Sequence, residues 1–288
     1  MTSAREVLRT AVGLPTLSSV VAELARLRDD DATTAQDFER VVAPDPALTA
    51  NLLRLANSPF FGARRQIESV KQAIALLGFD RVFEVAVSAS FSSVLPEKIP
   101  GFDISAGDFF IHSFAVGVTG ERLAKRCNLP STDLVFTAGL LHDIGKLAIG
   151  ALLWKHASSL EAALKEDGVP FIESEHHLIG TNHTEVGALI VEMWDLPASI
   201  GTAARWHHHP DDVDVASEQT LVDVIHIADG LSHMLGFGAD VGELKRELNA
   251  HAMTRLNVKV MELESVALEV TEQISEMSTL FKGQFGGQ

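Results

Sequence analysis

The stretch FTAGLLHDIGKLAI, residues 136–149, constrains the fold of this chain more than any other. It places His142, Asp143 and Lys146 within an otherwise apolar run. Burying such groups is unfavourable unless each of them has a partner. A divalent metal ion together with a phosphate-bearing ligand would pair with all three. The stretch therefore predicts a buried polar site whose further ligands come from other parts of the chain.

The composition narrows the class of protein and its partners. The 288 residues carry a formal net charge of −16, which argues against broad binding to nucleic acid because that needs clusters of Lys and Arg. The single cysteine, Cys127, excludes a disulfide framework and a Cys-rich zinc site. The N-terminus has no basic-then-apolar signal pattern, and no apolar stretch approaches the roughly 20 residues that cross a membrane. We expect a cytoplasmic protein that binds neither nucleic acid nor a membrane.

Helical patterns run through the first part of the chain. Apolar residues recur at helical spacing, and no stretch alternates cleanly at the period of two that is typical of a strand. Thr33 and Gln36 have the spacing of a capping box. Asp45 followed by Pro46 predicts a helix start, and Gly78 predicts a helix end. Residues 1–95 are therefore expected to form a bundle of short helices.

A connector that contains Pro and Gly, LPEKIPGFDIS at residues 95–105, separates the bundle from the rest of the chain. All 12 histidines lie at or after position 112, so the titratable chemistry is confined to the second part, residues 96–288. The helical patterns of that part predict segments 108–126, one from Ser131 or Thr132 that carries His142, 151–167, 184–194 behind a capping box of Asn182 and Glu185, one that starts at Leu196-Pro197 and runs into Trp206-His207-His208-His209-Pro210, and 221–235. The predicted fold class is all-α.

Candidate metal ligands are spread over several of these predicted helices. Asp108 and His112 are four residues apart and therefore share a helix face, although Asp108 could instead cap its helix. Asp229 lies in an apolar run, where an unpaired carboxylate would be unfavourable. The full candidate set combines imidazoles and carboxylates: Asp108, His112, His142, Asp143, His183, His207, His208 and Asp229. Such a donor set suits Zn, Fe or Mn.

The other histidines are interpreted as lying outside the site. His209 is expected to face solvent or to support a ligand. His176 and His177 could border the pocket, but a place on a surface loop is favoured. The remaining imidazoles are assigned structural roles: His156, His226, His233 and His251. Lys146 is either a phosphate contact or a solvated lysine at a helix end.

These motifs resemble a known superfamily. LLHDIGK, with His112 upstream and Asp229 downstream, resembles the HD superfamily of metal-dependent phosphohydrolases. The segments VAPDPALTANLLRLANSPFFG, IESVKQAIALLGFDRV, HLIGTNHTEVGALIVEMWDLPASI and WHHHP are more similar to the HDOD family, bacterial signalling domains related to HD and HD-GYP proteins. The resemblance covers residues 14–240. It implies an N-terminal helical bundle packed on an HD-type helical domain.

The resemblance also implies roles for the candidate residues. Many HDOD proteins have lost HD ligands and are thought to be non-catalytic regulatory modules, but this chain keeps a candidate at each position of the HD-GYP-like pattern. A dinuclear Fe, Mn or Zn site is implied. Lys146 lies at the position expected to contact a substrate phosphate, and Lys146 and Asp143 are the implied catalytic residues. The Gly-Tyr-Pro element after the paired histidines is missing, and the chain contains no Tyr. This departure argues against cyclic di-GMP as the specific substrate, but not against metal binding.

Two functions of different classes follow. The first is a signal-transduction protein that binds one or two metal ions at a retained HD site and acts through a ligand or partner. The alternative is a metal-dependent phosphohydrolase or phosphodiesterase that acts on a nucleotide, including a cyclic dinucleotide. The expected small ligand is a nucleotide or another phosphate-bearing molecule. The histidine-free N-terminal bundle is either a docking surface for a protein partner or structural support.

Overall fold

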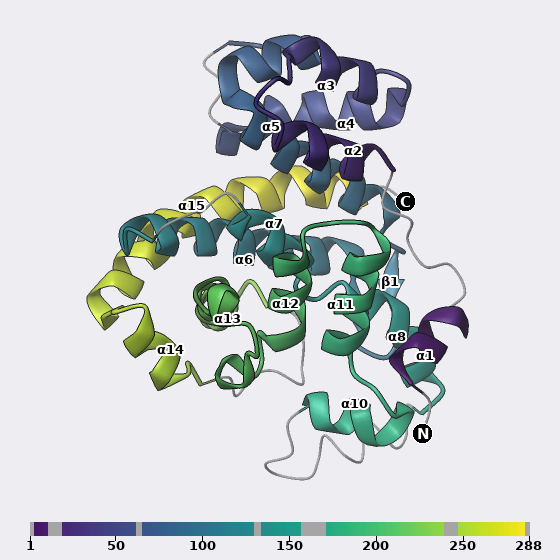
Figure 1. Ribbon diagram of the computed structural model, residues 1–288, viewed down its shortest axis with the longest axis vertical. Coiled ribbons are helices and arrows are strands. Elements are labelled where there is room, and N and C mark those ends of the chain that lie inside the picture. Colours follow the sequence, from purple (N-terminus) through teal and green to yellow (C-terminus); the bar gives the residue numbers. More distant parts are fainter. Residues whose placement is uncertain are drawn as a thin grey trace.

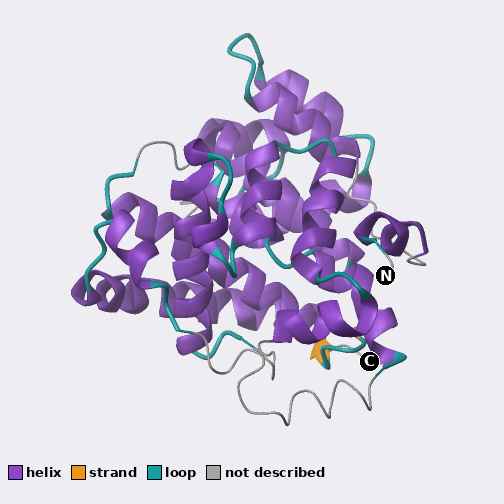
Figure 2. Cartoon of the chain, turned by 60° about the horizontal axis from the view of Figure 1, so that its bottom comes forward, coloured by secondary structure: helices purple, strands orange, loops and turns teal. Residues whose placement is uncertain are grey.

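The computed structural model confirms the all-α prediction (Figure 1). It describes residues 3–10, 19–61, 65–129, 134–156, 171–238 and 247–285. The predicted helix start at Ser131 or Thr132 and most of the predicted helix at 151–167 lie outside these ranges. The only strands among the described residues are an antiparallel pair of two residues each, β1 (Lys98–Ile99) and β2 (Ile104–Ser105), in the predicted connector (Figure 2).

The N-terminal bundle consists of α2 (Ser19–Arg28), α3 (Ala35–Val42), α4 (Pro46–Ala56), the short 3-10 helix η1 (Pro59–Phe61) and α5 (Val70–Val94). The Asp45 side chain accepts from the backbone N–H of Leu48 and begins α4 as predicted. The capping box of α3 uses Thr34 and Asp37, one residue later than predicted. Gly78 has φ of 84° and interrupts α5, which agrees with the predicted helix end.

The first helix does not belong to this bundle. Helix α1 (Ala4–Thr10) packs against α8 (Gly145–Trp154) and α11 (His183–Met193) in the other half of the molecule (Figure 1). Its Val7 and Leu8 are buried there. The start of the chain therefore contributes to the core of the second part, although the sequence pattern grouped it with residues 1–95.

The second part is built around α6 (Ala106–Arg126). Helices α7 (Val135–Leu141), α13 (Gln219–Met234) and α15 (Val260–Phe285) pack against it. Helix α11 packs on α12 (Ala198–Trp206), while α10 (Phe171–Ile179) contacts α8, and α14 (Ala250–Arg255) contacts α13. Two short 3-10 helices, η2 (Pro210–Asp212) and η3 (Ala216–Glu218), precede α13. The helices that carry the candidate ligands thus surround one centre.

One stretch of the described residues, Val135–Trp154, has the length and apolar composition of a membrane span, contrary to the prediction that none does. Within its most apolar window, 83% of the residues are buried inside the protein. The stretch is also divided between α7 and α8 by the turn that contains His142 and Asp143. It is therefore a core segment of this fold.

Candidate metal centre

The His-Asp pair lies in the turn between α7 and α8, and not within one helix as the sequence suggested. His142 is the residue that ends α7, and its Nδ1–H donates to the Gly139 carbonyl at 2.7 Å. His142 is 0% and Asp143 1% exposed. The turn thus directs both side chains into the protein rather than along a helix face.

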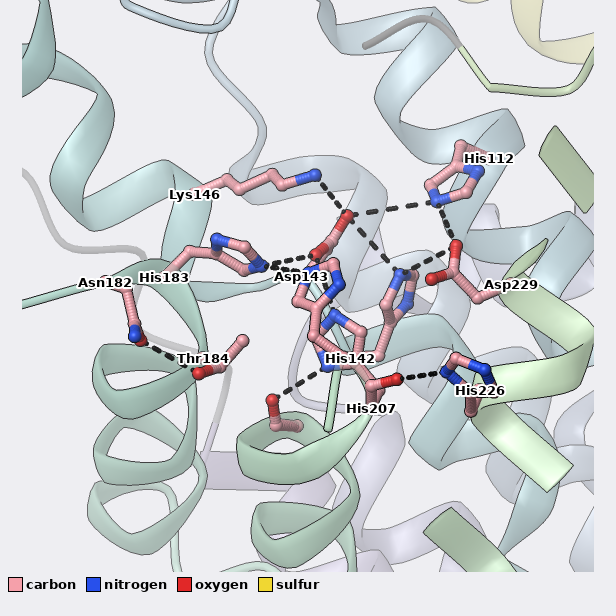
Figure 3. Close-up of polar contacts among 12 residues, drawn as sticks. His112, His142, Asp143, Lys146, Asn182, His183, Thr184, His207, His226 and Asp229 are labelled. Carbon is pink, nitrogen blue, oxygen red and sulfur yellow. Dashed lines mark hydrogen bonds and ion pairs between the residues drawn. The ribbon is translucent and has the colours of Figure 1, made fainter. Parts of the chain in front are cut away.

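Asp143 is the carboxylate on which most of the site converges (Figure 3). Its Oδ1 lies 3.4 Å from His183 Nε2 and 3.5 Å from His207 Nε2, while its Oδ2 lies 3.3 Å from His142 Nε2. The Lys146 ammonium forms an ion pair with Oδ2 at 2.7 Å. Burial alone would raise the pKa of Asp143, but the neighbouring His142 and Lys146 lower that pKa well below its usual value. Asp143 is therefore ionised.

Close helix packing brings His183 to this carboxylate. A side chain at Gly145, the first residue of α8, would lie 1.9 Å from the His183 carbonyl oxygen and 2.7 Å from the Gly187 backbone nitrogen. Only a glycine permits that approach between α8 and the first turn of α11. Asn182 begins α11 as predicted, because its side chain accepts from the Glu185 backbone N–H.

The Nδ1 atoms of three rings are held by acceptors on the protein. The His142 ring donates to Gly139, and the His207 Nδ1–H donates to the Ala204 carbonyl at 2.9 Å. The His183 Nδ1–H donates to the Glu175 carboxylate at 2.8 Å. A ring whose only proton is on Nδ1 presents the lone pair of its Nε2. These three lone pairs are directed at Asp143, which is the arrangement that outer partners impose on metal-ligating histidines.

A second carboxylate, Asp229 on α13, lies on the other side of His142. Its Oδ1 is 3.3 Å from His112 Nε2, 3.6 Å from His233 Nε2 and 3.7 Å from His142 Nε2. Burial lowers the pKa of His112 well below its usual value, and the nearby His233 and His142 lower it further. His112 is therefore a neutral imidazole, the form that binds a metal.

Seven of the eight predicted ligands come together in this way. Their donor atoms form overlapping groups within 4.8 Å of one another, including Asp143 with His183, His207 and His208, and His112 with His142 and Asp143. His208 is half-buried, and its Nε2 lies 2.9 Å from His183 Nε2. Lys146, predicted as a phosphate contact or a solvated lysine, is 1% exposed and therefore not solvated.

Asp108 is the predicted ligand that the structure does not bring to the cluster. It is exposed in the first turn of α6, where its Oδ2 accepts from the Ser105 hydroxyl at 2.7 Å. Ser105, and not Asp108, caps the helix. Asp108 instead lines a surface cavity of about 390 Å³ with Ile111 and Gly238. The four-residue spacing places it on a face with His112, but one turn nearer the surface.

Sequence reasoning missed two residues of the site, Glu175 and His233. Glu175 is 0% exposed and holds His183, yet it lies in a run that reads as a surface segment, FIESEHH. His176 and His177 of that run are exposed, as predicted, but they lie on helix α10 and not on a loop. His233 had a detectable signal, because it follows Asp229 by four residues, the same spacing that selected Asp108 and His112.

The chemistry of the cluster fits a transition metal. His112, His142 and His207 each have a buried Nε2 without a hydrogen-bond partner among the described residues. Lone pairs that converge on two carboxylates repel one another unless a proton or a cation lies between them. Imidazole with carboxylate suits Zn, Fe or Mn, whereas Mg²⁺ and Ca²⁺ prefer oxygen ligands alone. The donor set therefore fits the predicted class of metal.

Comparison with known proteins identifies the family. The family model of the HDOD domain matches residues 14–210. The structure superposes on an HDOD domain protein of unknown function from Geobacter sulfurreducens, with a TM-score of 0.78, 24% identity and coverage of 97% of this chain and 96% of that one. It also superposes on a candidate phosphohydrolase from Shewanella amazonensis SB2B, with a TM-score of 0.73, 24% identity and coverage of 99% and 98%.

A relative in sequence is an uncharacterized protein of Treponema pallidum (strain Nichols), which is 23% identical over 199 residues. The aligned region covers 68% of this chain but 38% of that protein, so the chain spans well under half the length of this relative. The structural likenesses show a shared fold, and the family match extends from the N-terminal bundle to the paired histidines. The chain belongs to the HDOD domain family.

Proposed function

We propose that the protein is a bacterial cytoplasmic signalling protein that binds one or two divalent transition-metal ions at this cluster. A phosphate-bearing ligand, such as a nucleotide, would bind at the metal and set the state of the protein. A protein from Marinobacter aquaeolei VT8 with the same fold is named a candidate signal transduction protein, which accords with this role.

One observation carries the proposal: three histidines with Nδ1 held by the protein direct Nε2 at one ionised carboxylate. Glu175, Gly139 and Ala204 supply the three acceptors. A merely structural cluster of this kind would leave these Nε2 lone pairs facing carboxylate oxygens with no cation between them. A metal site makes use of every one of these orientations.

The residues divide between two positions. Asp143 with His183, His207 and His208 would hold one ion, and His112 with His142 and Asp229 would hold the other. When bound, such ions polarise a phosphate oxygen as Lewis acids. The protein's own groups orient that ligand and exclude water, because all these ligands except the half-buried His208 are buried.

The second candidate function is a metal-dependent phosphohydrolase or phosphodiesterase, and Lys146 is the observation that favours it. A buried ammonium beside the central carboxylate could neutralise a phosphate charge during hydrolysis. In the structure, however, Lys146 is paired with Asp143 at 2.7 Å, so it would have to leave that carboxylate to reach a ligand. This pairing favours the signalling role.

Hydrolysis assays separate the two functions. The metal-loaded chain is incubated with a panel of nucleotides that includes cyclic dinucleotides, with Mn²⁺ or Fe²⁺ added. Turnover that disappears when His142→Ala and Asp143→Ala are combined would establish the enzyme. Absence of turnover, together with retained metal and tight binding of one nucleotide, would establish the signalling protein.

The N-terminal bundle is proposed as the surface for a protein partner. It projects from the rest of the molecule (Figure 1), and its Leu76 is a large apolar side chain that is 55% exposed. A pull-down with the full chain and with Leu76→Asp tests this role. Loss of one specific protein from the variant supports docking, and equal recovery assigns the bundle to structural support.

A further inference from the structure

We infer that His233 is an additional ligand of the metal position at Asp229. The inference rests on the proposed metal binding and deepens it, because the sequence pattern assigns His233 no part in the site. It would make the two metal positions alike, each with three imidazoles around one carboxylate oxygen. His233 would thereby raise the affinity of the Asp229 position for an imidazole-preferring cation.

His233 lies as close to the Asp229 carboxylate as the predicted ligands do. Its Nε2 lies 3.6 Å from Asp229 Oδ1, between the 3.3 Å of His112 and the 3.7 Å of His142. His112, Asp229 and His233 form a group whose donor atoms all lie within 4.8 Å of one another. The four-residue spacing on α13 places the Asp229 and His233 side chains one above the other, as helix geometry requires.

The position around Asp143 provides the internal comparison. There, Oδ1 faces His183 at 3.4 Å and His207 at 3.5 Å, and His208 completes the group. Without His233, the Asp229 position would have two imidazoles, His112 and His142, and both of them also lie near Asp143, at 3.8 Å and 3.3 Å. His233 supplies a third imidazole, which groups with Asp229 and not with Asp143.

The surroundings of His233 hold its ring in place. The ring packs against His112, with centroids 4.5 Å apart. A side chain at Gly238 would lie 1.9 Å from His233 Nδ1, so the bare backbone of Gly238 is required to seat the ring. Gly238 also lines the 390 Å³ surface cavity, and the His233 side chain is 10% exposed, more than Asp229 or His112. His233 is thus the ligand of this position nearest to solvent.

The inference is tested by metal binding rather than by activity. Wild type, His233→Ala and the control His251→Ala, which removes an imidazole that is 77% exposed, are stripped with a chelator and titrated with Zn²⁺ and with Co²⁺. Calorimetry gives stoichiometry and affinity, and the Co²⁺ absorption spectrum reports the ligands. We expect His233→Ala to weaken one of two binding events by about tenfold or more, with the other event and the control unchanged.

A second variant distinguishes the loss of a metal ligand from a folding defect. Gly238→Ala keeps the imidazole but forces the His233 ring to move, so it should weaken the same binding event; the metal-free melting temperatures of all variants show whether they fold. Equal stoichiometry, affinity and Co²⁺ spectra in wild type, His233→Ala and Gly238→Ala overturn the inference while leaving the proposed function intact. Absence of metal binding by wild type overturns both.

Discussion

The Glu175 carboxylate accepts two hydrogen bonds from His183, one from its backbone N–H and one from its Nδ1–H, both at 2.8 Å. Both residues are 0% exposed. One side chain thereby fixes the start of α11, the orientation of the ring and its tautomer. A carboxylate behind an imidazole also makes that imidazole a stronger ligand.

Replacing Glu175 by Gln should weaken metal binding by about 10- to 100-fold, because the amide accepts more weakly and carries no charge. Zn²⁺ titration of the chelator-stripped protein measures the change. Glu173→Gln, on the exposed face of the same helix, is the matched control and should bind like wild type. If Glu175→Gln binds Zn²⁺ with unchanged affinity, His183 is not a metal ligand.

Gly145→Ala should separate α8 from α11. The added methyl group would overlap the His183 carbonyl, so the helices must move apart, at a cost of about 1–3 kcal/mol in the free energy of unfolding. Metal affinity should fall as well, since His183 moves with its backbone. Gly201→Ala is the control, because a methyl group there meets its nearest neighbours at an ordinary 3.6 Å. Urea unfolding with and without Zn²⁺ measures both effects.

Lys146→Met should destabilise the metal-free protein far more than the metal-bound protein. Lys146 compensates the charge of Asp143 when no cation is present, and loss of one partner from a buried ion pair costs about 3–5 kcal/mol. A bound divalent cation would take over that compensation. Thermal unfolding should therefore show a larger stabilisation by Zn²⁺ in Lys146→Met than in wild type. An equal shift in both proteins would place the metal away from Asp143.

Glu84 predicts a pH dependence of stability away from the metal centre. Burial and the nearby Glu121 raise its pKa to about 8 from an unfolded value of 4.5, although Arg81 opposes the shift. Between these two values the folded state keeps a proton that the unfolded state has lost, so stability falls as the pH rises through this window. Glu84→Gln has no such proton to lose. Its stability relative to wild type should therefore rise from about pH 5.5, inside the window, to about pH 8.5, just above it. Urea unfolding at both values, with the exposed Glu97→Gln as control, measures the difference.

Much of this fold could be predicted from local patterns. Asp45 before Pro46, Gly78 and Asn182 each mark a helix boundary that the structure confirms, because capping and left-handed conformations are decided by neighbouring residues. The packing of α1 on α8 and α11 could not be predicted, since an amphipathic pattern shows which face of a helix is buried but not which other helices bury it.

The candidate site shows the same division. A polar residue within an apolar run signals burial, so His142, Asp143 and Asp229 could be selected from sequence. Glu175 could not, because its run also contains exposed histidines and only the tertiary fold turns its carboxylate toward His183. Asp108 shows the limit of the four-residue spacing rule. The rule predicts that two residues lie on the same face of a helix, but not how deeply each of them is buried.

The metal content of the freshly purified chain shows whether the His-Asp cluster holds a metal ion. Elemental mass spectrometry should find at least one equivalent of Fe, Mn or Zn per wild-type chain. A variant that combines His142→Ala and Asp143→Ala should lose this metal. The His251→Ala control should retain it. A folded wild-type chain that holds no stoichiometric transition metal, either as purified or after reconstitution, would rule out the metal site.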